Sequence, residues 1–424
     1  MLSSIYQLRI RDVLTLCVMG LLLLGVLMVQ SASTNVVDQS QWTSKGTKHA
    51  IFAAVALATF FIVGAIDYGW LARAPKTIWR SPIFWILVVA AVANLVVLVP
   101  GVGMSVNHAR RWIKLGPIQI QPSELAKWAV VIYLAYWLTR RPVNMDKFFT
   151  GFLPTMVPIC VLCLLVVIED FGTATLIALA ALTMLLAGKV RWRHLALTIP
   201  PVLAIAAWFV MHKDYRWRRI TAFANPYADP TREGYHMIQS LLSFATGGFA
   251  GRGLGNGIQK LGYLPEDTTD FIFSVICEEL GFFGALLTIA LYLGILYCAW
   301  ETLKEKKDNF GRLLAFGVGT MVALQAVINI AVATVSVPTK GLSLPLVSFG
   351  GSGLIITCAA LGLLRSATRR EHEAEEFEVE KVGGDDASNS SKAGAIRMAR
   401  ASTAATSGAI TRVSDRMWQH FTSH

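Results

Sequence analysis

Apolar residues along this chain of 424 residues gather in long runs that are separated by short polar segments. A helix needs roughly 20 consecutive apolar residues to cross the hydrocarbon core of a bilayer. Ten runs are about long enough: residues 13–31, 49–67, 81–103, 121–139, 150–169, 171–189, 195–211, 270–300, 312–336 and 347–366. The pattern therefore predicts an all-α integral membrane protein with ten transmembrane helices.

Composition supports this class, because 54% of the residues are hydrophobic and only 15% are charged. A soluble domain has about 25% charged residues. The first run is long and no small-residue cleavage site follows it, so we expect it to remain as a membrane helix. Beyond residue 366 the chain turns acidic and then basic. This change predicts a transmembrane domain over 1–366 and a largely disordered cytoplasmic tail over 367–424.

Lysine and arginine residues predict the orientation. If the N-terminus is cytoplasmic, the inner loops carry most basic residues, from Arg9 and Arg11 at the start to Arg369 and Arg370 at the end. This satisfies the positive-inside rule with both termini cytoplasmic and a large extracytoplasmic loop, residues 212–270, between helices 7 and 8. The net charge of +11 is thus explained by the membrane topology. We expect the protein to interact with a membrane and not with nucleic acid.

Two predicted outer loops break this charge bias. One carries Arg110, Arg111 and Lys114, and the other begins with an arginine-rich piece that includes Arg216. Guanidinium groups bind phosphate through paired donors, and Trp112 beside them is typical of the lipid headgroup level. A lipid diphosphate is the simplest ligand for these groups, although a long loop such as the second also escapes the charge rule.

Two charged residues interrupt the fourth run. Glu124 and Lys127 are three positions apart and share a helix face, and charges within a span usually face the bundle interior or a wet cavity. Lys127 is predicted either to meet a ligand phosphate or orient a catalytic group, or to form an internal ion pair that fixes helix packing. Ser123 is the candidate N-cap of this helix.

The stretch from Gly234 to Gly281 concentrates the remaining chemistry. Its glycine run leaves the backbone free to take positive φ or to approach a ligand closely. The run lacks a following Gly-Lys-Ser/Thr and opens no βαβ unit, so a P-loop and a dinucleotide site are both unsupported. Asp270 stands where this polar segment meets the eighth apolar run. It is predicted to act either as a partly desolvated base or as a helix cap.

Further polar groups are predicted on the same outer side. Asp170 lies in a tight turn between the fifth and sixth runs, where it either joins the other outer groups or only forms the turn. Residues 338–353, rich in Pro, Gly and Ser, are predicted to line the same cavity as Asp270. Gln325 and Asn329 are four positions apart in the ninth run, and we expect them to form hydrogen bonds across helices.

Five segments occur in order across residues 107–353: ARRWIKLGPIQIQPSELAK, EDFGTA, GYHMIQSLLSFATGGFAGRGLG, IQKLGYLPEDTTDFIFSVICEELG and PLVSFGGSG. Together they resemble the SEDS family of bacterial envelope polymerases. RRW, QK-x-x-YLP and SFGGSG are closer to the division member of this family than to its elongation member. The resemblance implies a peptidoglycan glycosyltransferase that polymerises lipid II on the outer face of the bacterial cytoplasmic (inner) membrane, at the division septum. It also implies a class B penicillin-binding protein transpeptidase and other divisome proteins as partners.

The resemblance implies roles for single residues as well. The acid of the TDFIF segment is catalytic in the family and matches Asp270. The PSE-x-x-K helix of the family matches Glu124 and Lys127. The acid before FGTA matches Asp170, and the Gln of the family's Q-S pair matches Gln239.

The chemistry of glycan extension fits these groups. Asp270 is the expected general base for the acceptor 4-hydroxyl, with inversion at the donor sugar. The family often has a histidine two residues before this acid, where Thr268 stands here, so no imidazole is expected at that position. Asp270 and Glu266 are the candidate ligands of a divalent cation, Mg²⁺ or Mn²⁺. The candidate substrate-binding residues are Arg110, Arg111, Lys114, Glu124, Lys127, Asp170, Arg216, Gln239 and Glu266.

Three alternatives remain open. An elongation or sporulation polymerase of the same family would share these residues. A transporter that flips lipid II would use the intramembrane charges as a translocation path, and should need polar groups through the full depth of the membrane. A scaffold that only recruits partners would depend on the tail, residues 371–424, and not on Asp270.

Overall fold

The computed structural model describes residues 9–33, 39–72, 80–100, 102–106, 109–115, 118–140, 145–212, 214–232, 234–305 and 308–368. Residues up to Thr368 belong to one compact unit. The predicted tail over 367–424 lies outside the described residues, except that residues 367 and 368 belong to the last helix. The last helix ends at Thr368, and the division into a transmembrane domain and a cytoplasmic tail stays a prediction.

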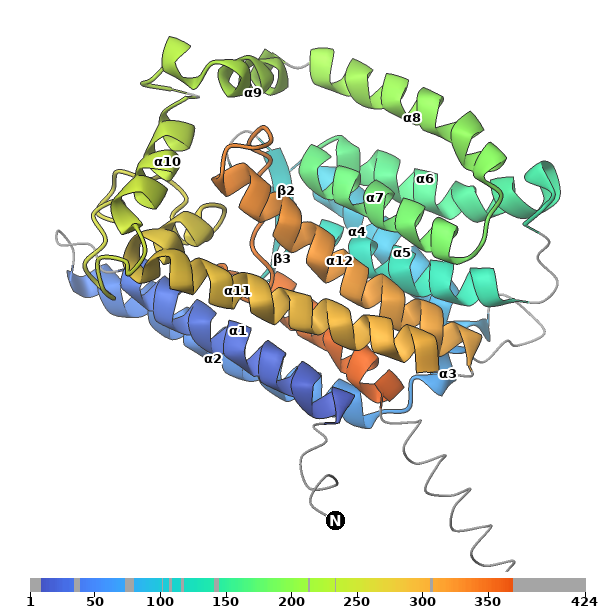
Figure 1. The fold of residues 1–424 in the computed structure, drawn as a ribbon. Helices are drawn as coiled ribbons and strands as arrows, with labels where there is room; N and C mark the ends of the chain where they lie inside the picture. Colours follow the sequence, from blue (N-terminus) through green and yellow to red (C-terminus); the bar gives the residue numbers. More distant parts are fainter. Residues whose placement is uncertain are drawn as a thin grey trace, which may run out of the picture. The chain divides into compact units, whose positions relative to one another are not determined.

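Helices make up most of the described unit, and a helix lies at each of the ten predicted runs (Figure 1). Their bounds are α1 Ile10–Ala32, α2 Gln39–Ala65, α3 Gly69–Ala72, α4 Pro82–Leu98, α5 Pro122–Thr139, α6 Leu153–Val167, α7 Phe171–Ala187, α8 Trp192–Met211, α9 Asp214–Ala224, α10 Tyr235–Gly247, α11 Ile272–Glu305 and α12 Asn309–Ala333. A π-helical turn, Phe148–Phe152, precedes α6. A last helix, Ser352–Thr368, ends the described chain.

Six of the described helices are long and apolar enough to cross a membrane: α1, Lys45–Ala65 within α2, Phe148–Val167, α8, Ile272–Lys304 within α11, and α12. Three further apolar helices are shorter, namely α4, α7 and the last helix. This is the pattern of a multi-pass α-helical membrane protein. The count of ten spans and the cytoplasmic location of both termini stay predictions.

The centre of the unit is built around α12, which packs against α5, α7 and α11. Helix α11 also packs against α1 and α10. Helix α5 is buried on most of its surface. Its two charged residues therefore face the protein interior, where the cost of a charge in a span can be met by polar partners.

A small antiparallel sheet, which the sequence did not predict, lies between α4 and α5. Its strands are β1 Gly103–Val106, β2 Ala109–Leu115 and β3 Ile118–Ile120, in the order β1-β2-β3. The predicted third span to residue 103 is wrong at its end, because α4 stops at Leu98. Val99 precedes a proline and is extended, with ψ of 126°, as the ring of a following proline requires.

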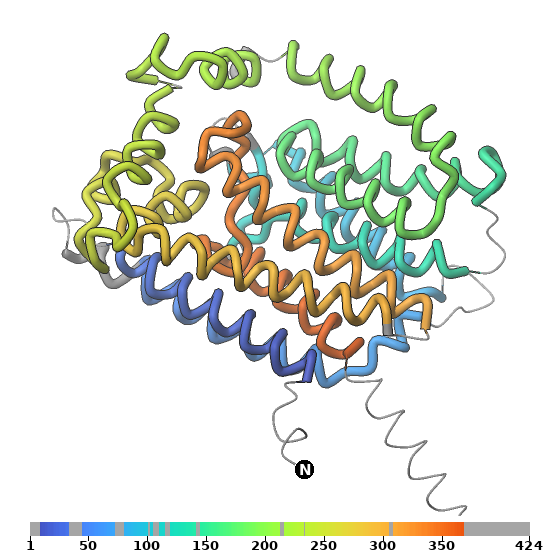
Figure 2. Tube along the Cα trace, viewed as in Figure 1, coloured from blue at the N-terminus to red at the C-terminus, as the bar shows by residue number. Residues whose placement is uncertain are grey.

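The chain between α8 and α11 forms a separate layer of structure (Figure 2). Helix α8 is apolar, yet Leu195 is its only buried residue, and it packs mainly against α9. Helix α9 carries the arginine-rich piece that includes Arg216. A short 3₁₀ turn, Pro226–Ala228, connects α9 to α10, and α10 packs against α11. This layer brings residues of the predicted loop over 212–270 back to the start of α11.

The glycine run packs against a break in α11. Gly281 inside this helix has φ of 66° and ψ of −157°, which interrupts the helical backbone. Gly248, Gly251, Gly253 and Gly255 have positive φ, as the run predicted. Gly251 makes its close approach to the protein's own backbone, at Glu279 and Gly281. A side chain at Gly251 would collide with that backbone.

Candidate active site

A cavity of about 810 Å³ is lined by residues of β2, α5, α7, α9, α10, α12 and the last helix, and by the segments that precede α11 and the last helix. Residues of the predicted 338–353 segment line it together with Asp270, which confirms the expectation that the two share a cavity. The cavity wall carries both signs of charge. Its charged lining residues are Arg111, Glu124, Arg219, Arg232, Glu266 and Asp270.

Asp270 lies just before the first turn of α11 and is partly exposed to the cavity. Its carboxylate forms no hydrogen bond or ion pair with any other residue that the structure describes, so the alternative role as a helix cap is not seen. Its backbone carbonyl accepts a hydrogen bond from Asn329 Nδ2 at 2.8 Å. The backbone is thus fixed while the carboxylate stays available.

Electrostatics favour a proton-accepting role for this carboxylate. Burial and then the charge of Glu266 raise the pKa of Asp270 to about 6, although Arg219 and Arg111 oppose the shift. A general base is most effective when its pKa lies near the working pH. At neutral pH Asp270 is therefore ionised and still a better proton acceptor than an ordinary aspartate.

Glu266 and Asp270 belong to one turn, residues 266–270, which we call the acidic turn. The backbone conformation of Glu266 is unusual. Its φ of 57° lies in the left-handed region, which a residue with a side chain rarely adopts. Its carbonyl accepts hydrogen bonds from Thr269 N at 3.1 Å and Phe271 N at 3.2 Å. Thr269 Oγ1 also donates to Glu266 Oε2 at 2.8 Å. Strained residues of this kind often occur at functional sites.

Gly341 allows the facing wall to approach Asp270. Its φ is 62°, and a Cβ atom there would lie 3.5 Å from Asp270 Oδ2 and 3.6 Å from Arg111 Nη1. Arg111 is itself oriented, because its Nε donates to Glu169 O at 2.9 Å. The carboxylate of Asp270 and the guanidinium of Arg111 therefore both lie beside Gly341, which has no side chain.

Glu124 and Lys127 form an internal ion pair at the cavity wall, with 2.8 Å between Lys127 Nζ and Glu124 Oε2. Lys127 is fully buried and also donates to Gln325 Oε1 at 2.6 Å. Gln325 Nε2 in turn donates to Ser343 O at 2.9 Å, on the cavity segment. Glu124 lines the cavity and Lys127 does not. The predicted hydrogen bonding of Gln325 across helices is confirmed.

Asp170 and Arg216 are occupied by contacts with the ends of helices. Asp170 caps α7, accepting hydrogen bonds from Thr173 N at 3.1 Å and Thr173 Oγ1 at 2.8 Å. Arg216 donates to the carbonyls of Val167 and Ile168, each at 3.1 Å. Ser123 is not the cap of α5, because Gln121 occupies that position.

The remaining predicted binding residues do not line the cavity. Arg110 donates its backbone N–H to Glu169 Oε2 at 2.8 Å, Lys114 is exposed, and Gln239 is half-buried on α10. Of the predicted site residues, the fold therefore brings four to the cavity: Arg111, Glu124, Glu266 and Asp270.

Sequence reasoning missed several lining residues. Arg219 lies in the arginine-rich piece beside Arg216, but spacing alone did not tell which side of the helix would face the cavity. Arg232 and His236 also line it. The ring of His236 stacks on Phe271, with ring centroids 6.0 Å apart. An imidazole is therefore present near Asp270, from α10 rather than from position 268.

A divalent cation fits the donor set of the acidic turn. No cluster of three or more His, Cys, Asp or Glu side chains suited to a metal exists within the described ranges. Mg²⁺, however, is usually held by one or two carboxylates together with substrate phosphates and water. Asp270 and Glu266 line one cavity and interact electrostatically, so they supply two such carboxylates.

Fold and cavity together define a multi-pass membrane protein with a charged, partly buried pocket that suits polar chemistry. The chain belongs to the FtsW/RodA/SpoVE family of cell cycle proteins, whose family model matches residues 11–373. The resemblance to SEDS proteins is thereby confirmed.

Curated relatives are similar over most of the chain. A probable peptidoglycan glycosyltransferase FtsW from Geobacter metallireducens is 38% identical over 363 residues, which cover 84% of this chain and 94% of that protein. A protein with the same name from Halothiobacillus neapolitanus is 36% identical over 377 residues, covering 87% of this chain and 88% of that protein.

Solved structures share the fold. A chain from a peptidoglycan synthase complex, studied for its coordination of polymerization and crosslinking, superposes with a TM-score of 0.67 at 26% identity. That match covers 84% of this chain and 97% of the other. Thermus thermophilus rod shape determining protein RodA superposes with a TM-score of 0.61 at 25% identity, covering 84% of this chain and 95% of that one.

Proposed function

We propose that the protein is a peptidoglycan glycosyltransferase that polymerises lipid II into glycan strands on the outer face of the cytoplasmic membrane during cell division. The observation that carries this proposal is the place of Asp270, an unpaired carboxylate among the described residues, in a cavity that also holds Arg111 and Arg219. Family membership and the relatives named as peptidoglycan glycosyltransferases support the same activity.

Asp270 acts as the general base in this proposal. The acceptor 4-hydroxyl oxygen forms a bond to the donor's anomeric carbon while Asp270 takes the hydroxyl proton. The bond from that carbon to the diphosphate oxygen breaks, and the diphosphate leaves with the electron pair. Attack from the side opposite the leaving group inverts the anomeric centre. Proton removal by a positioned base contributes about 10²- to 10⁴-fold in rate.

The leaving diphosphate needs positive charge, which the cavity wall supplies. Arg111, Arg219 and Arg232 line the same cavity as Asp270 and are proposed to bind the diphosphate through paired N–H donors. Lys127 has a different role, because its ammonium group is buried against Glu124 and Gln325. It is proposed to hold Glu124 in position and, through Gln325, the segment over residues 338–353 that lines the cavity.

Asp270 and Glu266 would hold a divalent cation, Mg²⁺ or Mn²⁺. Bound there, the cation would stabilise the negative charge that develops on the diphosphate oxygens. Glu266 and Asp270 line the same cavity, which supports a shared ion.

The partner is proposed to be a class B penicillin-binding protein transpeptidase, with which the chain acts among other divisome proteins at the septum. The similar chain in a peptidoglycan synthase complex supports a partner that cross-links the glycan product. The curated relatives carry the name FtsW, which favours a division role over elongation or sporulation.

The test uses the purified full-length protein in liposomes that contain lipid II and Mg²⁺. Wild type should make glycan strands, and Asp270→Asn should make at least 100-fold less. Asp267→Asn is the matched control, since Asp267 lies three residues away and does not line the cavity. Equal polymer from wild type and Asp270→Asn would remove Asp270 from the mechanism.

A lipid II transporter is the second candidate. It would require polar groups along the full depth of the membrane. The charged lining residues instead come from β2, the first turn of α5, α9 and the segments that precede α10 and α11. The same liposomes separate the two functions, because a transporter would move labelled lipid II between leaflets without making polymer.

A further inference from the structure

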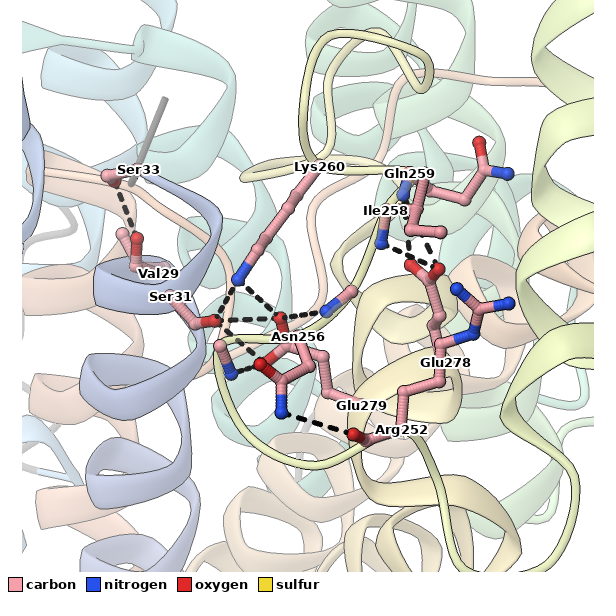
Figure 3. Close-up of polar contacts among 12 residues, drawn as sticks. Val29, Ser31, Ser33, Arg252, Asn256, Ile258, Gln259, Lys260, Glu278 and Glu279 are labelled. Carbon is pink, nitrogen blue, oxygen red and sulfur yellow. Dashed lines mark hydrogen bonds and ion pairs between the residues drawn. The ribbon is translucent and has the colours of Figure 1, made fainter. Parts of the chain in front are cut away.

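A second group of charged residues lies outside the cavity and is closed to solvent. Lys260 and Glu279 form an ion pair of 2.7 Å, with side chains only 2% and 0% exposed. Ser31, at the end of α1, accepts a hydrogen bond from Lys260 Nζ at 2.9 Å and donates to Glu279 Oε2 at 2.7 Å. Figure 3 shows Lys260 reaching from the glycine-rich loop to this pair of partners.

The neighbouring Glu278 binds the backbone N–H groups of the same loop. Its carboxylate accepts hydrogen bonds from Ile258 N at 2.9 Å and Gln259 N at 3.2 Å (Figure 3). Glu279 also accepts one from Gly255 N at 3.1 Å. Both carboxylates are therefore fully surrounded by donors, and neither lines the cavity. The proposed reaction uses none of them.

The position of this ion pair in the sequence connects it to the cavity. Lys260 and Glu279 stand at the two ends of residues 261–278, and that segment contains Glu266 and Asp270. The ion pair therefore joins the two ends of this segment. Its tip is fixed separately, because Phe349 N donates to Thr268 O at 2.8 Å on the cavity side.

Packing alone does not explain a buried ion pair here. Helix α1 already packs along α11, and apolar residues of α1 such as Leu14, Val18 and Leu21 are fully buried. Replacing a buried ion pair by apolar residues is often neutral or stabilising, so such a pair adds little to stability by itself. What charged hydrogen bonds do add is a defined direction and spacing for the groups they join.

We propose that the Lys260–Glu279 ion pair, with Ser31, is a positioning device that sets where the acidic turn of Glu266 and Asp270 stands in the cavity. Lys260 and Glu279 are positioning residues, because they touch neither the cavity nor Asp270. This inference rests on the proposed function of Asp270. It predicts that the ion pair controls turnover, while substrate binding depends on arginines from β2, α9 and residue 232.

The test compares Lys260→Met, Glu279→Gln and the double variant in the lipid II polymerisation assay, together with thermal unfolding in detergent. Each single variant leaves one buried charge without its partner, so both should unfold at lower temperature. The double variant removes both charges and should regain most of the wild-type unfolding temperature. Its turnover should nevertheless stay at least fivefold below wild type, with the KM for lipid II unchanged.

A double variant with wild-type turnover and wild-type unfolding temperature would overturn the proposal, because the pair would then serve stability alone. Ser31→Ala gives an independent measurement if the double variant does not fold. It removes one hydroxyl and keeps the ion pair, so it should fold normally and lose turnover. Wild-type turnover in Ser31→Ala would equally count against the proposal.

The matched control is the ion pair at the other end of α11. Lys304 and Glu301 are 3.1 Å apart, and the Lys304 side chain is 54% exposed. Lys304→Met with Glu301→Gln should leave both turnover and unfolding temperature unchanged. Asp270→Asn is assayed alongside: if it is active, the proposed function itself fails. If it is inactive while the Lys260 and Glu279 double variant is fully active, only the positioning role fails.

Discussion

Asp270 and the two glutamates that follow it in the chain, Glu278 and Glu279, have opposite surroundings. Glu278 and Glu279 are fully buried, and backbone N–H groups, a lysine and a serine satisfy them. Asp270 faces a cavity and has no hydrogen-bond donor on its carboxylate among the described residues. Burial and the charge of Glu266 raise the pKa of Asp270 to about 6.

The difference indicates which charge holds the fold and which does chemistry. A buried charge whose partners are complete keeps its neighbours at fixed positions, and removing a partner is costly. A carboxylate that is partly desolvated and unpaired is less stable in its ionised form, and so it is ready to accept a proton. Neutralising one carboxylate of each kind should therefore have opposite effects on activity and stability.

The largest effect is expected for Asp270→Asn. Loss of the base should lower the polymerisation rate by at least about 100-fold. The unfolding temperature should stay the same or rise, because the variant no longer holds an ionised carboxylate whose pKa the fold has raised. Polymerisation rates and thermal unfolding in detergent check both signs. A large fall in unfolding temperature would place Asp270 with the structural carboxylates instead.

Gly341→Ala should come next, with about tenfold lower activity. A side chain at φ of 62° costs about 1–2 kcal/mol, and the new methyl would stand 3.5 Å from Asp270 Oδ2. The control is Gly262→Ala, where φ is 97° and nothing lies within 4 Å. Both variants carry backbone strain, and only the first places a methyl group in contact with the base, in space that a substrate would need. Similar activity in the two would mean that strain alone, and not access to Asp270, matters.

Glu278→Gln should change stability more than activity. The amide keeps one oxygen for the N–H groups of Ile258 and Gln259 and turns an NH₂ group toward them. Hydrogen bonds to charged groups contribute about 1.5–3 kcal/mol each, so unfolding should occur several degrees lower. Glu301→Gln on the same helix is the control, because Glu301 is partly exposed. Equal unfolding temperatures would contradict the structural role of Glu278.

Much of the fold could be predicted from hydropathy, because a membrane span leaves a long local signal. The sheet from Gly103 to Ile120 could not, since its strands are short and β2 contains the basic residues Arg110, Arg111 and Lys114. The break at Gly281 was also missed, because it depends on contact with the glycine run some 30 residues earlier in the chain. Local pattern does not show such a partner.

The candidate site followed the same division. Asp270 could be predicted because it stands at a boundary between polar and apolar sequence. Arg219 could not be separated from Arg216, since only the packing of α9 decides which one faces the cavity. Lys127 was left with two roles, and its burial against Glu124 and Gln325 favours the internal ion pair.

The smallest expected effect concerns pH. Because the base must be deprotonated, the wild-type rate should fall as the pH drops through about 6, the raised pKa of Asp270. Glu266→Gln removes a negative charge that raises this pKa, so the acid limb should move to lower pH. The move should be smaller than the full distance from 6 to 3.8, because burial is the larger cause and remains.

Rates relative to each variant's own plateau, measured from pH 5 to 8, check this shift. The control is Asp267→Asn, because burial also raises the pKa of Asp267 to about 6 although it does not line the cavity. Glu266→Gln does not separate Asp267 from Asp270, because the charge of Glu266 raises the pKa of both. If Asp267→Asn moved or removed the limb, the titrating group would be Asp267. The raised pKa of Asp270 would then no longer distinguish it from the buried carboxylates, because Asp270 would not be the group that titrates during turnover.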